Sequence, residues 1–444
     1  MERIRTITLA VAALLALPAV AQRQWTLQEC IDYAMEHNIS LQQKKIEQRS
    51  AAEDVKYSRA EMLPSLSAST NQSVGYRPWE DSGQMTVTNG YVNSKVDKSY
   101  YNGSYGINAS WTVWNGGRNT NTIRLNELTE QQAELDAATT ANSIQEQIAR
   151  LYVQVLYLRE AITVAEATLQ TSRKNEDRGQ EMLNVGKMSK ADLAQLASQR
   201  ATDEYSLVEA QTQLASYMQQ LRQVLQLTTD ADFDVADPAV DDQQALSDIP
   251  SLRSVYEAAL LSRPEIARAQ LALKSSDVQM KIARAGWLPT VSMTGGLGTS
   301  TNSMSSTGWG SQMKTNFDAS AGVTISLPIF DNRSTRTSVN KARLQQENYQ
   351  LALDDLETTL YQTIENYWLD ATTNQQKYRA ATATVESEQQ SYGLLSEQFN
   401  LGLKNIVELM TGKDRLLTAQ QNQLQSKYLT ILNLQMLKFY SGAK

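Results

Sequence analysis

Residues 144–169 read IQEQIARLYVQVLYLREAITVAEATL, and the spacing of the apolar residues in this stretch decides the fold class. The apolar positions follow one another in steps of four and three, and they are Ile144, Ile148, Leu151, Val155, Leu158, Ile162, Ala165 and Leu169. Such a repeat, sustained over several heptads, is typical of a coiled coil. No proline and only Gly179 interrupts residues 119–183. We therefore expect one helix there, roughly 100 Å long at about 1.5 Å per residue.

The same pattern returns 216 residues later in the chain, at Leu360, Ile364, Tyr367, Ala371, Asn374, Tyr378, Ala381 and Val385. Nearer the start of each half the offset is 225, because residues 63–65 (LPS) match residues 288–290 (LPT). The shorter offset implies a shortened loop in the second half, where an exposed connection tolerates length changes. The sequence therefore predicts an internal duplication. Its first repeat spans residues 22–229, a solvated acidic linker spans 230–250, and the second repeat spans 251–444.

Each repeat also contains two stretches in which apolar and small polar residues alternate, as expected for β-strands. The stronger stretches are residues 104–113 and 317–327, and the weaker ones begin near Leu66 and Val291. Strands of about ten residues with one apolar face can cross a bilayer. Strands of a sandwich packed on the helices would look similar, so this alternative stays open. Four strands are too few to close a barrel, and a lipid-facing sheet would therefore need several chains.

The start of the chain indicates the compartment. Arg3 and Arg5 precede an apolar run at residues 7–20, which ends in Ala-Val-Ala before Gln22. This arrangement predicts a secretory signal peptide at residues 1–21. The full chain has a formal charge of −7 from 41 Lys+Arg and 48 Asp+Glu. It contains no basic cluster, which argues against nucleic acid as a partner.

The chain contains one cysteine, Cys30, and one histidine, His37. An internal disulfide, a Cys/His zinc site and a two-histidine metal site are therefore excluded. The two residues lie seven positions apart on a helical pattern, about 10 Å along the axis, which is too far for a nucleophile and its base. We interpret Cys30 as a small apolar filler, and we expect no catalytic residue, metal or cofactor.

Two short segments at matching places in the repeats each carry a glycine between helical stretches. They read NVGKMSKADL at residues 184–193 and FNLGLKNIVEL at residues 399–409. Together with the Leu-Pro junctions and the duplicated layout, they resemble the TolC-like outer membrane efflux protein family. The resemblance implies a mainly α protein with a membrane β-barrel. In that family three chains contribute four strands each to a 12-stranded barrel, continued by a long coiled-coil helical tunnel across the periplasm.

The resemblance also implies roles for the hairpin tips. The residues that it assigns to the gate are Asp192, Phe399, Lys404 and Glu408. The residues that it assigns to adaptor contact are Asn184, Val185, Gly186, Lys187, Asn400, Leu401, Gly402 and Leu403. Ala191 and Thr411 stand where the family's type example has a threonine and an aspartate, so we expect fewer polar contacts in this gate. The implied partners are two further copies of the chain, a periplasmic adaptor (membrane fusion) protein, an inner-membrane pump and outer membrane lipid.

A structural role competes with the gate at the same residues. Ser189 with Asp192, and Asn405 with Glu408, have the spacing of capping boxes that satisfy N–H groups at a helix start. A helix-capping role and a gating role are compatible at these residues, and both interpretations stay open.

Three functions fit the whole pattern to different degrees. The first is a passive outer membrane duct of an efflux or type I secretion system in a Gram-negative cell. The second is a trimeric coiled-coil surface adhesin or structural envelope protein, against which the matched glycine tips argue. The third is a periplasmic enzyme that uses paired carboxylates, for which the acidic linker offers only solvated candidates.

Overall fold

The structure is a computed structural model that describes residues 24–79, 82–87, 90–95, 98–228, 233–236 and 242–442. The predicted signal peptide and residues 230–232 and 237–241 of the acidic linker lie outside the described residues. The chain divides into two compact units. One comprises Met1–Ile46, Leu135–Ala267 and Asp354–Lys444, and the other comprises Glu47–Glu134 and Arg268–Leu353. In the part of the chain that the structure describes, no helix is both long and apolar enough to cross a membrane.

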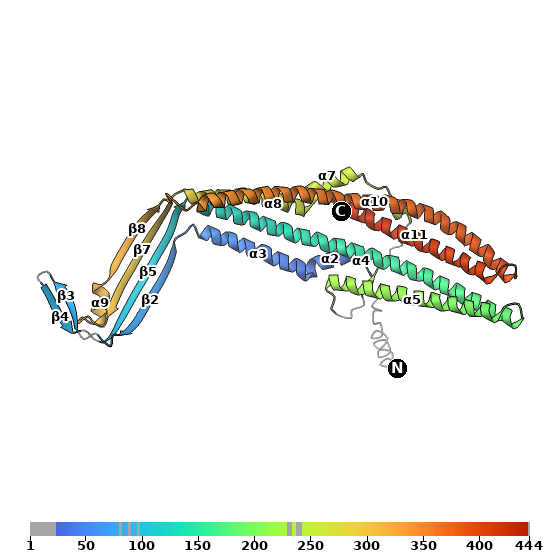
Figure 1. Ribbon diagram of the computed structural model, residues 1–444, viewed down its shortest axis with the longest axis horizontal. Helices are drawn as coiled ribbons and strands as arrows, with labels where there is room; N and C mark the ends of the chain where they lie inside the picture. Colours follow the sequence, from blue (N-terminus) through green and yellow to red (C-terminus); the bar gives the residue numbers. More distant parts are fainter. Residues whose placement is uncertain are drawn as a thin grey trace, which may run out of the picture. The chain divides into compact units, whose positions relative to one another are not determined.

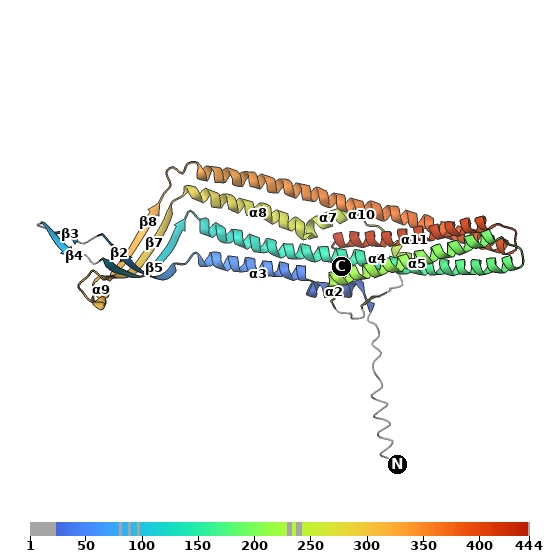
Figure 2. The same cartoon turned by 60° about the horizontal axis from the view of Figure 1, so that its bottom comes forward.

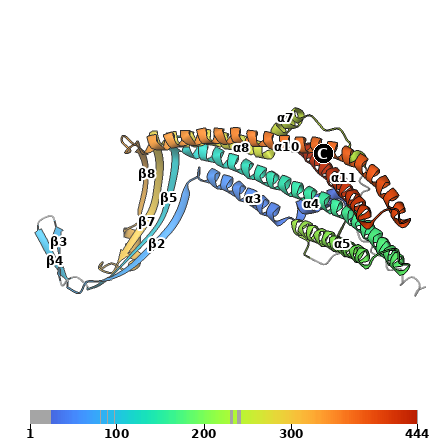
Figure 3. The same ribbon diagram turned by 45° about the vertical axis from the view of Figure 1, so that its right-hand side comes forward.

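The second unit is built around a four-stranded antiparallel sheet (Figure 3). Its strands are β2 (Ser65–Tyr76), β5 (Ser99–Asn115), β7 (Thr290–Asn302) and β8 (Asp318–Ser326), in the order β2-β5-β7-β8. All four correspond to stretches that the alternating pattern predicted. The central pair, β5 and β7, joins strands from the two halves of the chain.

One end of this sheet carries the junctions with the four long helices. The strand β2 follows α3 (Ile39–Ala60), β5 leads into α4 (Arg118–Asn184), β7 follows α8 (Pro264–Arg284) and the short η1 (Ala285–Trp287), and β8 leads into α10 (Ser334–Asn400). Proline cannot continue a helix, and Pro64 and Pro289 mark two of these junctions. The other end carries the loops, which the sequence pattern did not resolve. They contain the hairpin β3 (Ser82–Val87) and β4 (Gly90–Lys95), and the helix α9 (Trp309–Thr315).

The two faces of the sheet differ in chemistry. Register pairs Ile107 with Leu297 and Ala109 with Gly295, and Val323 lies beside Met293 on the same face. The side chains of Ile107, Leu297 and Val323 are 46%, 47% and 62% exposed. The opposite face consists of the alternate residues, which are mostly serine, threonine, asparagine and glycine. An apolar face left open to this extent needs a partner or a lipid environment.

The first unit is helical (Figure 1). It contains α2 (Leu27–His37), α5 (Lys190–Leu225), α6 (Asp242–Ala245), α7 (Leu252–Ser262), α11 (Ile406–Tyr440) and the larger parts of α4 and α10. The heptad prediction is confirmed, because α4 and α10 are continuous helices of 67 residues each. Their predicted core positions include Ile148, Val155, Ile364 and Ala371, and none of these four side chains is exposed at all.

Two helical hairpins, α4–α5 and α10–α11, lie side by side in this unit (Figure 2). Cys30 is fully buried in the unit's main apolar cluster, which confirms its interpretation as an apolar filler. Burial raises the pKa of the Cys30 thiol to about 12, and the thiol therefore stays protonated at neutral pH. The His37 ring stacks on Tyr33 with ring centroids 4.0 Å apart.

The segment between the two halves is more firmly held than a solvated linker. One described part of it contains β6 (Asp234–Val235), which pairs in parallel with β1 (Gln24–Trp25). The Asp234 carboxylate forms an ion pair with Arg159 of α4, and the Tyr152 hydroxyl donates to the carbonyl oxygen of Ala236 (2.9 Å). The expectation of a purely solvated segment is thus wrong at these positions, because cations and hydroxyls of α4 reach it.

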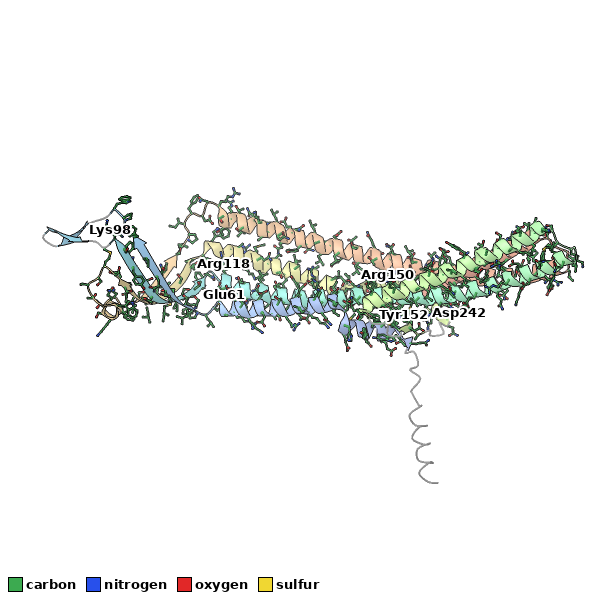
Figure 4. All side chains as sticks on the ribbon, turned by 90° about the horizontal axis from the view of Figure 1, so that it is seen from below. Glu61, Lys98, Arg118, Arg150, Tyr152 and Asp242 are labelled. Atoms are coloured by element: carbon green, nitrogen blue, oxygen red, sulfur yellow. The ribbon has the colours of Figure 1, made fainter. Side chains whose placement is uncertain are left out.

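A second attachment lies at α6. Asp242 pairs with Lys427 of α11 (3.1 Å), and Figure 4 labels Asp242 together with Tyr152. Hydrogen bonding from Lys427 lowers the pKa of the Asp242 carboxyl. Lys427 also lies 3.4 Å from the carboxylate of Glu160 on α4. The segment between the halves is therefore attached to α4 of the first half and to α11 of the second.

Candidate functional site at the hairpin tips

Each hairpin turns at a glycine whose backbone lies in the left-handed region. The φ angles are +71° at Gly186 and +77° at Gly402. The N–H of Lys187 donates to the carbonyl oxygen of Met182 (2.8 Å), and the equivalent bond forms in the second hairpin. These are the bonds of a Schellman motif, which closes the end of a helix. No atom lies within 4 Å of a Cβ placed on either glycine. The backbone angle alone therefore requires glycine here.

The turn residues predicted for adaptor contact are all exposed in the chain, and they are Asn184, Val185, Gly186, Lys187, Asn400, Leu401, Gly402 and Leu403. Three of them are apolar. The side chains of Val185, Leu401 and Leu403 are 68%, 75% and 70% exposed. Apolar residues that stay open at a helix end are available for contact with another protein.

Ser189 is the N-cap of α5, and Asp192 in the first turn is bonded to it. The backbone N–H of Asp192 donates to the Ser189 hydroxyl (3.1 Å), and this hydroxyl donates to the Asp192 carboxylate (2.7 Å). An acidic side chain in the first turn of a helix also interacts favourably with the helix dipole. In the structure Asp192 is therefore bonded within its own hairpin. Only half of the predicted capping box forms, because the Asp192 carboxylate accepts from the Ser189 hydroxyl rather than from the Ser189 N–H.

Lys404 and Glu408 form an ion pair with 2.6 Å between the Lys404 Nζ and the Glu408 Oε1. The other Glu408 oxygen accepts from the N–H of Asn405 (3.2 Å), and the Asn405 side chain accepts from the N–H of Glu408 (2.9 Å). This is a complete capping box at the start of α11. The hydrogen bond from Lys404, followed by that from Asn405, lowers the pKa of the Glu408 carboxyl. The family resemblance directs Lys404 toward a neighbouring hairpin, whereas here its partner is four residues away.

Phe399 is buried at the base of the second tip, with 4% of its surface exposed. It belongs to an apolar cluster with Met182 of α4, Leu196 of α5, and Ile406 and Leu409 of α11. Phe399 therefore packs the two hairpins of one chain against each other.

A buried polar cluster that the sequence analysis missed lies farther along the same hairpins. The Lys413 ammonium of α11 forms an ion pair with Asp203 of α5 and donates to the Ser172 hydroxyl of α4 (2.5 Å). Ser172 donates in turn to Asp203, and Gln199 donates to the other carboxylate oxygen (3.2 Å). The side chains of Lys413 and Asp203 are 6% and 5% exposed. This cluster, hereafter the Lys413 cluster, links three helices.

Tyr392 lies near the Lys413 cluster and is partly buried. Tyr392 of α10 accepts a hydrogen bond from Asn175 of α4 (3.3 Å). Burial raises the pKa of the Tyr392 hydroxyl, and the nearby Asp203 carboxylate adds to the effect. Within the described residues no group of histidine, cysteine, aspartate and glutamate side chains could hold a metal ion.

A model of the family described as outer membrane efflux protein matches residues 30–226 and 255–443. These two segments make up most of the chain, and the chain therefore belongs to the outer membrane efflux protein family. It is a passive outer membrane channel of a Gram-negative bacterium, of the efflux or type I secretion kind, and it is not an enzyme.

Individual relatives are similar over most of their length. The chain is 23% identical to the probable efflux pump outer membrane protein TtgC of Pseudomonas putida, over 91% of this chain and 81% of TtgC. It is 21% identical to the outer membrane protein TolC of Escherichia coli, over 74% of this chain and 72% of TolC. The crystal structure of the CmeC outer membrane channel of Campylobacter jejuni shares the fold, with a TM-score of 0.76 at 19% identity. That likeness covers 94% of this chain and 86% of CmeC.

Proposed function

We propose that three copies of the chain close a 12-stranded barrel in the outer membrane, and that their helices line the passage through the periplasm. The observation that carries this proposal is the four-stranded sheet with an open apolar face. In the described chain β2 and β8 each pair along one edge only. Unpaired strand edges are not tolerated in lipid. Joining β8 of one chain to β2 of the next removes all edges when three chains close a ring.

The height of the apolar face supports a membrane location. Tyr105 and Trp114 lie nine residues apart on β5, which is about 30 Å at roughly 3.4 Å per residue. At a strand tilt of about 40° this length spans about 23 Å, close to the apolar band of about 25 Å in outer membrane barrels. Aromatic residues at both levels match the girdles of such barrels. The polar face would then line the lumen.

The duplication and the domain boundaries are supported by the positions of the elements. The helices α2 and α7 begin at residues 27 and 252, which are 225 apart, whereas α4 and α10 begin at residues 118 and 334, which are 216 apart. Both offsets equal those read from the sequence. Repeats at 22–229 and 251–444, preceded by a signal peptide at 1–21, account for this layout.

The hairpin tips would serve two roles in the assembled channel. Their exposed apolar side chains would contact a periplasmic adaptor, which connects the channel to an inner-membrane pump. The residues just behind them would form the aperture, with Glu408 in an acidic ring and with Lys404, Asp192 and Phe399 holding the hairpins in the closed arrangement. The Lys404–Glu408 pair supports this role, because it fixes a carboxylate and an ammonium at the first turn of α11.

Two measurements test the proposal. The detergent-solubilised protein should have a mass of three chains and should conduct ions in a planar bilayer. A mass of one chain, with the strand content intact, would refute the barrel.

The gate is tested by the single variants Lys404→Ala and Asp192→Ala and by their double variant. Each single variant should raise the conductance, and the double variant should add little if the two residues act in one closed arrangement. Lys190→Ala, at the exposed first residue of α5, is the matched control and should conduct like the parent. If both single variants also conduct like the parent, then Asp192 and Lys404 act only as local contacts within their hairpins.

A further inference from the structure

The connection between β7 and β8 folds back onto the sheet instead of extending away from it. It contains α9 (Trp309–Thr315), and the buried Gln312 side chain fixes this helix to the end of β7. The Gln312 Nε2 donates to the carbonyl oxygens of Asn302 (3.0 Å) and Thr307 (2.7 Å). Its Oε1 accepts from the N–H of Asn302 (2.8 Å). The buried Gln312 amide thus donates two hydrogen bonds and accepts one, and together they hold α9 at the end of β7.

Two further contacts show which face of the sheet α9 covers. The Thr299 hydroxyl of β7 donates to the carbonyl oxygen of Met313 in α9 (2.8 Å). The Trp309 indole of α9 meets the Tyr105 ring of β5 edge to face, with centroids 6.2 Å apart. Thr299 and Tyr105 are directly opposite each other in the sheet register. Both therefore project from the same face, and α9 lies over that face.

This face is the apolar one. Two residues farther along the same strands, Ile107 and Leu297 are again directly opposite each other. Side chains two positions apart on a strand share a face, so Ile107 and Leu297 lie on the face that carries Tyr105 and Thr299. The small polar residues Ser104 and Ser300 pair on the other face. The helix α9 thus lies outside the surface that would line a lumen.

We propose that α9 is a membrane-surface element that contacts the phosphate headgroups of the outer leaflet from outside the barrel wall. The inference rests on the proposed barrel, in which the apolar face meets lipid. The helix α9 lies at the loop end of the sheet, opposite the end that carries the four long helices. Trp309 is 57% exposed, and an indole with one polar edge is favoured at the membrane interface. Lys314 is exposed on the same short helix, where its charge attracts anionic phosphates.

The consequence concerns access to the pore. Because α9 lies on the lipid side, the connection between β7 and β8 leaves the outer mouth of the lumen open. The same contacts would anchor the outer rim of each chain at the level of the headgroups. Trp111 and Trp114 near the helix junctions would occupy the other interface.

The test uses the full-length assembled protein in vesicles of phosphatidylcholine and phosphatidylglycerol. A fluorescent reporter is attached at Ser311→Cys, an exposed position of α9 that leaves Lys314 in place. The matched control is Ser104→Cys, which lies on the polar face of β5 beside Tyr105. Cys30 is fully buried and does not compete for the label. Quenching of the reporter fluorescence is compared between a lipid that carries a nitroxide near its headgroup and a water-soluble quencher. In a separate measurement, the introduced cysteine is modified with a bulky thiol reagent and the conductance is recorded.

We expect the lipid-borne nitroxide to quench the reporter at Ser311→Cys several-fold more than the reporter at Ser104→Cys. Adding Lys314→Glu to the Ser311→Cys protein should weaken that quenching. Modification at Ser311→Cys should leave the conductance unchanged, whereas modification at Ser104→Cys should reduce it. A loss of conductance on modification at Ser311→Cys, with quenching only from water, would place α9 in the lumen and overturn the inference. Strong lipid quenching at both positions would overturn the barrel itself, and the inference with it.

Discussion

Replacing Lys413 by methionine should loosen α11 from the α4–α5 hairpin of the same chain. Methionine has a similar length but no charge, and the substitution therefore leaves the buried Asp203 carboxylate without its cation. Breaking a buried ion pair in this way costs about 3–5 kcal/mol. The Ser172 hydroxyl and the Gln199 amide would still donate to Asp203, and we therefore expect the lower end, about 3 kcal/mol. Since about 1.4 kcal/mol is a factor of ten, local opening should become more frequent by about two orders of magnitude.

Hydrogen exchange of the assembled protein, followed by mass spectrometry, measures this opening directly. Peptides around Lys413 and Asp203 should exchange about 100-fold faster in Lys413→Met, whereas peptides from the four-stranded sheet should not change. Lys187→Met, at an exposed turn position, is the control and should exchange like the parent. In the double variant with Asp203→Leu, exchange should return toward the parent, because a packed apolar pair can replace a buried ion pair. Unchanged exchange in Lys413→Met would refute the reasoning, since Asp203 would then not depend on Lys413.

Three further outcomes follow from the same structure. Gly402→Ala should lower the midpoint of thermal unfolding, because a φ of +77° costs a residue with a Cβ about 1–2 kcal/mol. Gly393→Ala is the control: this glycine lies within α10 with open space around it, and alanine should raise the midpoint because it favours the helix. The pKa of Glu408 is lowered in the folded chain. The stability that Glu408 contributes to the start of α11 is therefore complete at neutral pH and is lost as the pH falls through that lowered pKa. Amide exchange in the first turn of α11, corrected for intrinsic rates, should rise on acidification in the parent but not in Glu408→Gln. Removal of residues 1–21 would leave a charge of −8 per chain, or −24 per proposed trimer. Reversal potentials in a salt gradient should therefore show cation preference, and anion preference would contradict this.

The periodic parts of the fold could be predicted from the sequence because each residue's environment follows from its neighbours in the chain. Ile148 and Ile364 are buried for the same reason, their place in a heptad, and the alternation around Ile107 gives both the strand and its apolar face. The tip glycines were also predictable, since a glycine between two helical patterns is the usual residue at a positive φ.

The remaining parts depend on partners that the sequence does not bring together. Lys413 and Asp203 are 210 residues apart, and each alone has the pattern of a solvated charge on a long helix. The helix α9 has only seven residues, too few for a period to be recognised. The Lys404–Glu408 pair does not follow from helical spacing either, because Lys404 precedes the N-cap Asn405 and therefore lies outside α11.

The seam between β5 and β7 determines when the sheet can form during export. The residues that pair across it, such as Asn108 and Gly296, are about 190 positions apart, and closing so long a loop slows folding. Until β7 has crossed the inner membrane, only the β2–β5 pair of the four-stranded sheet can form, and a two-stranded pair is marginal in water. The apolar face of that pair would be unprotected for the whole of this interval. A periplasmic holdase that binds alternating apolar strands would therefore be needed early in biogenesis, before any contact between subunits is possible.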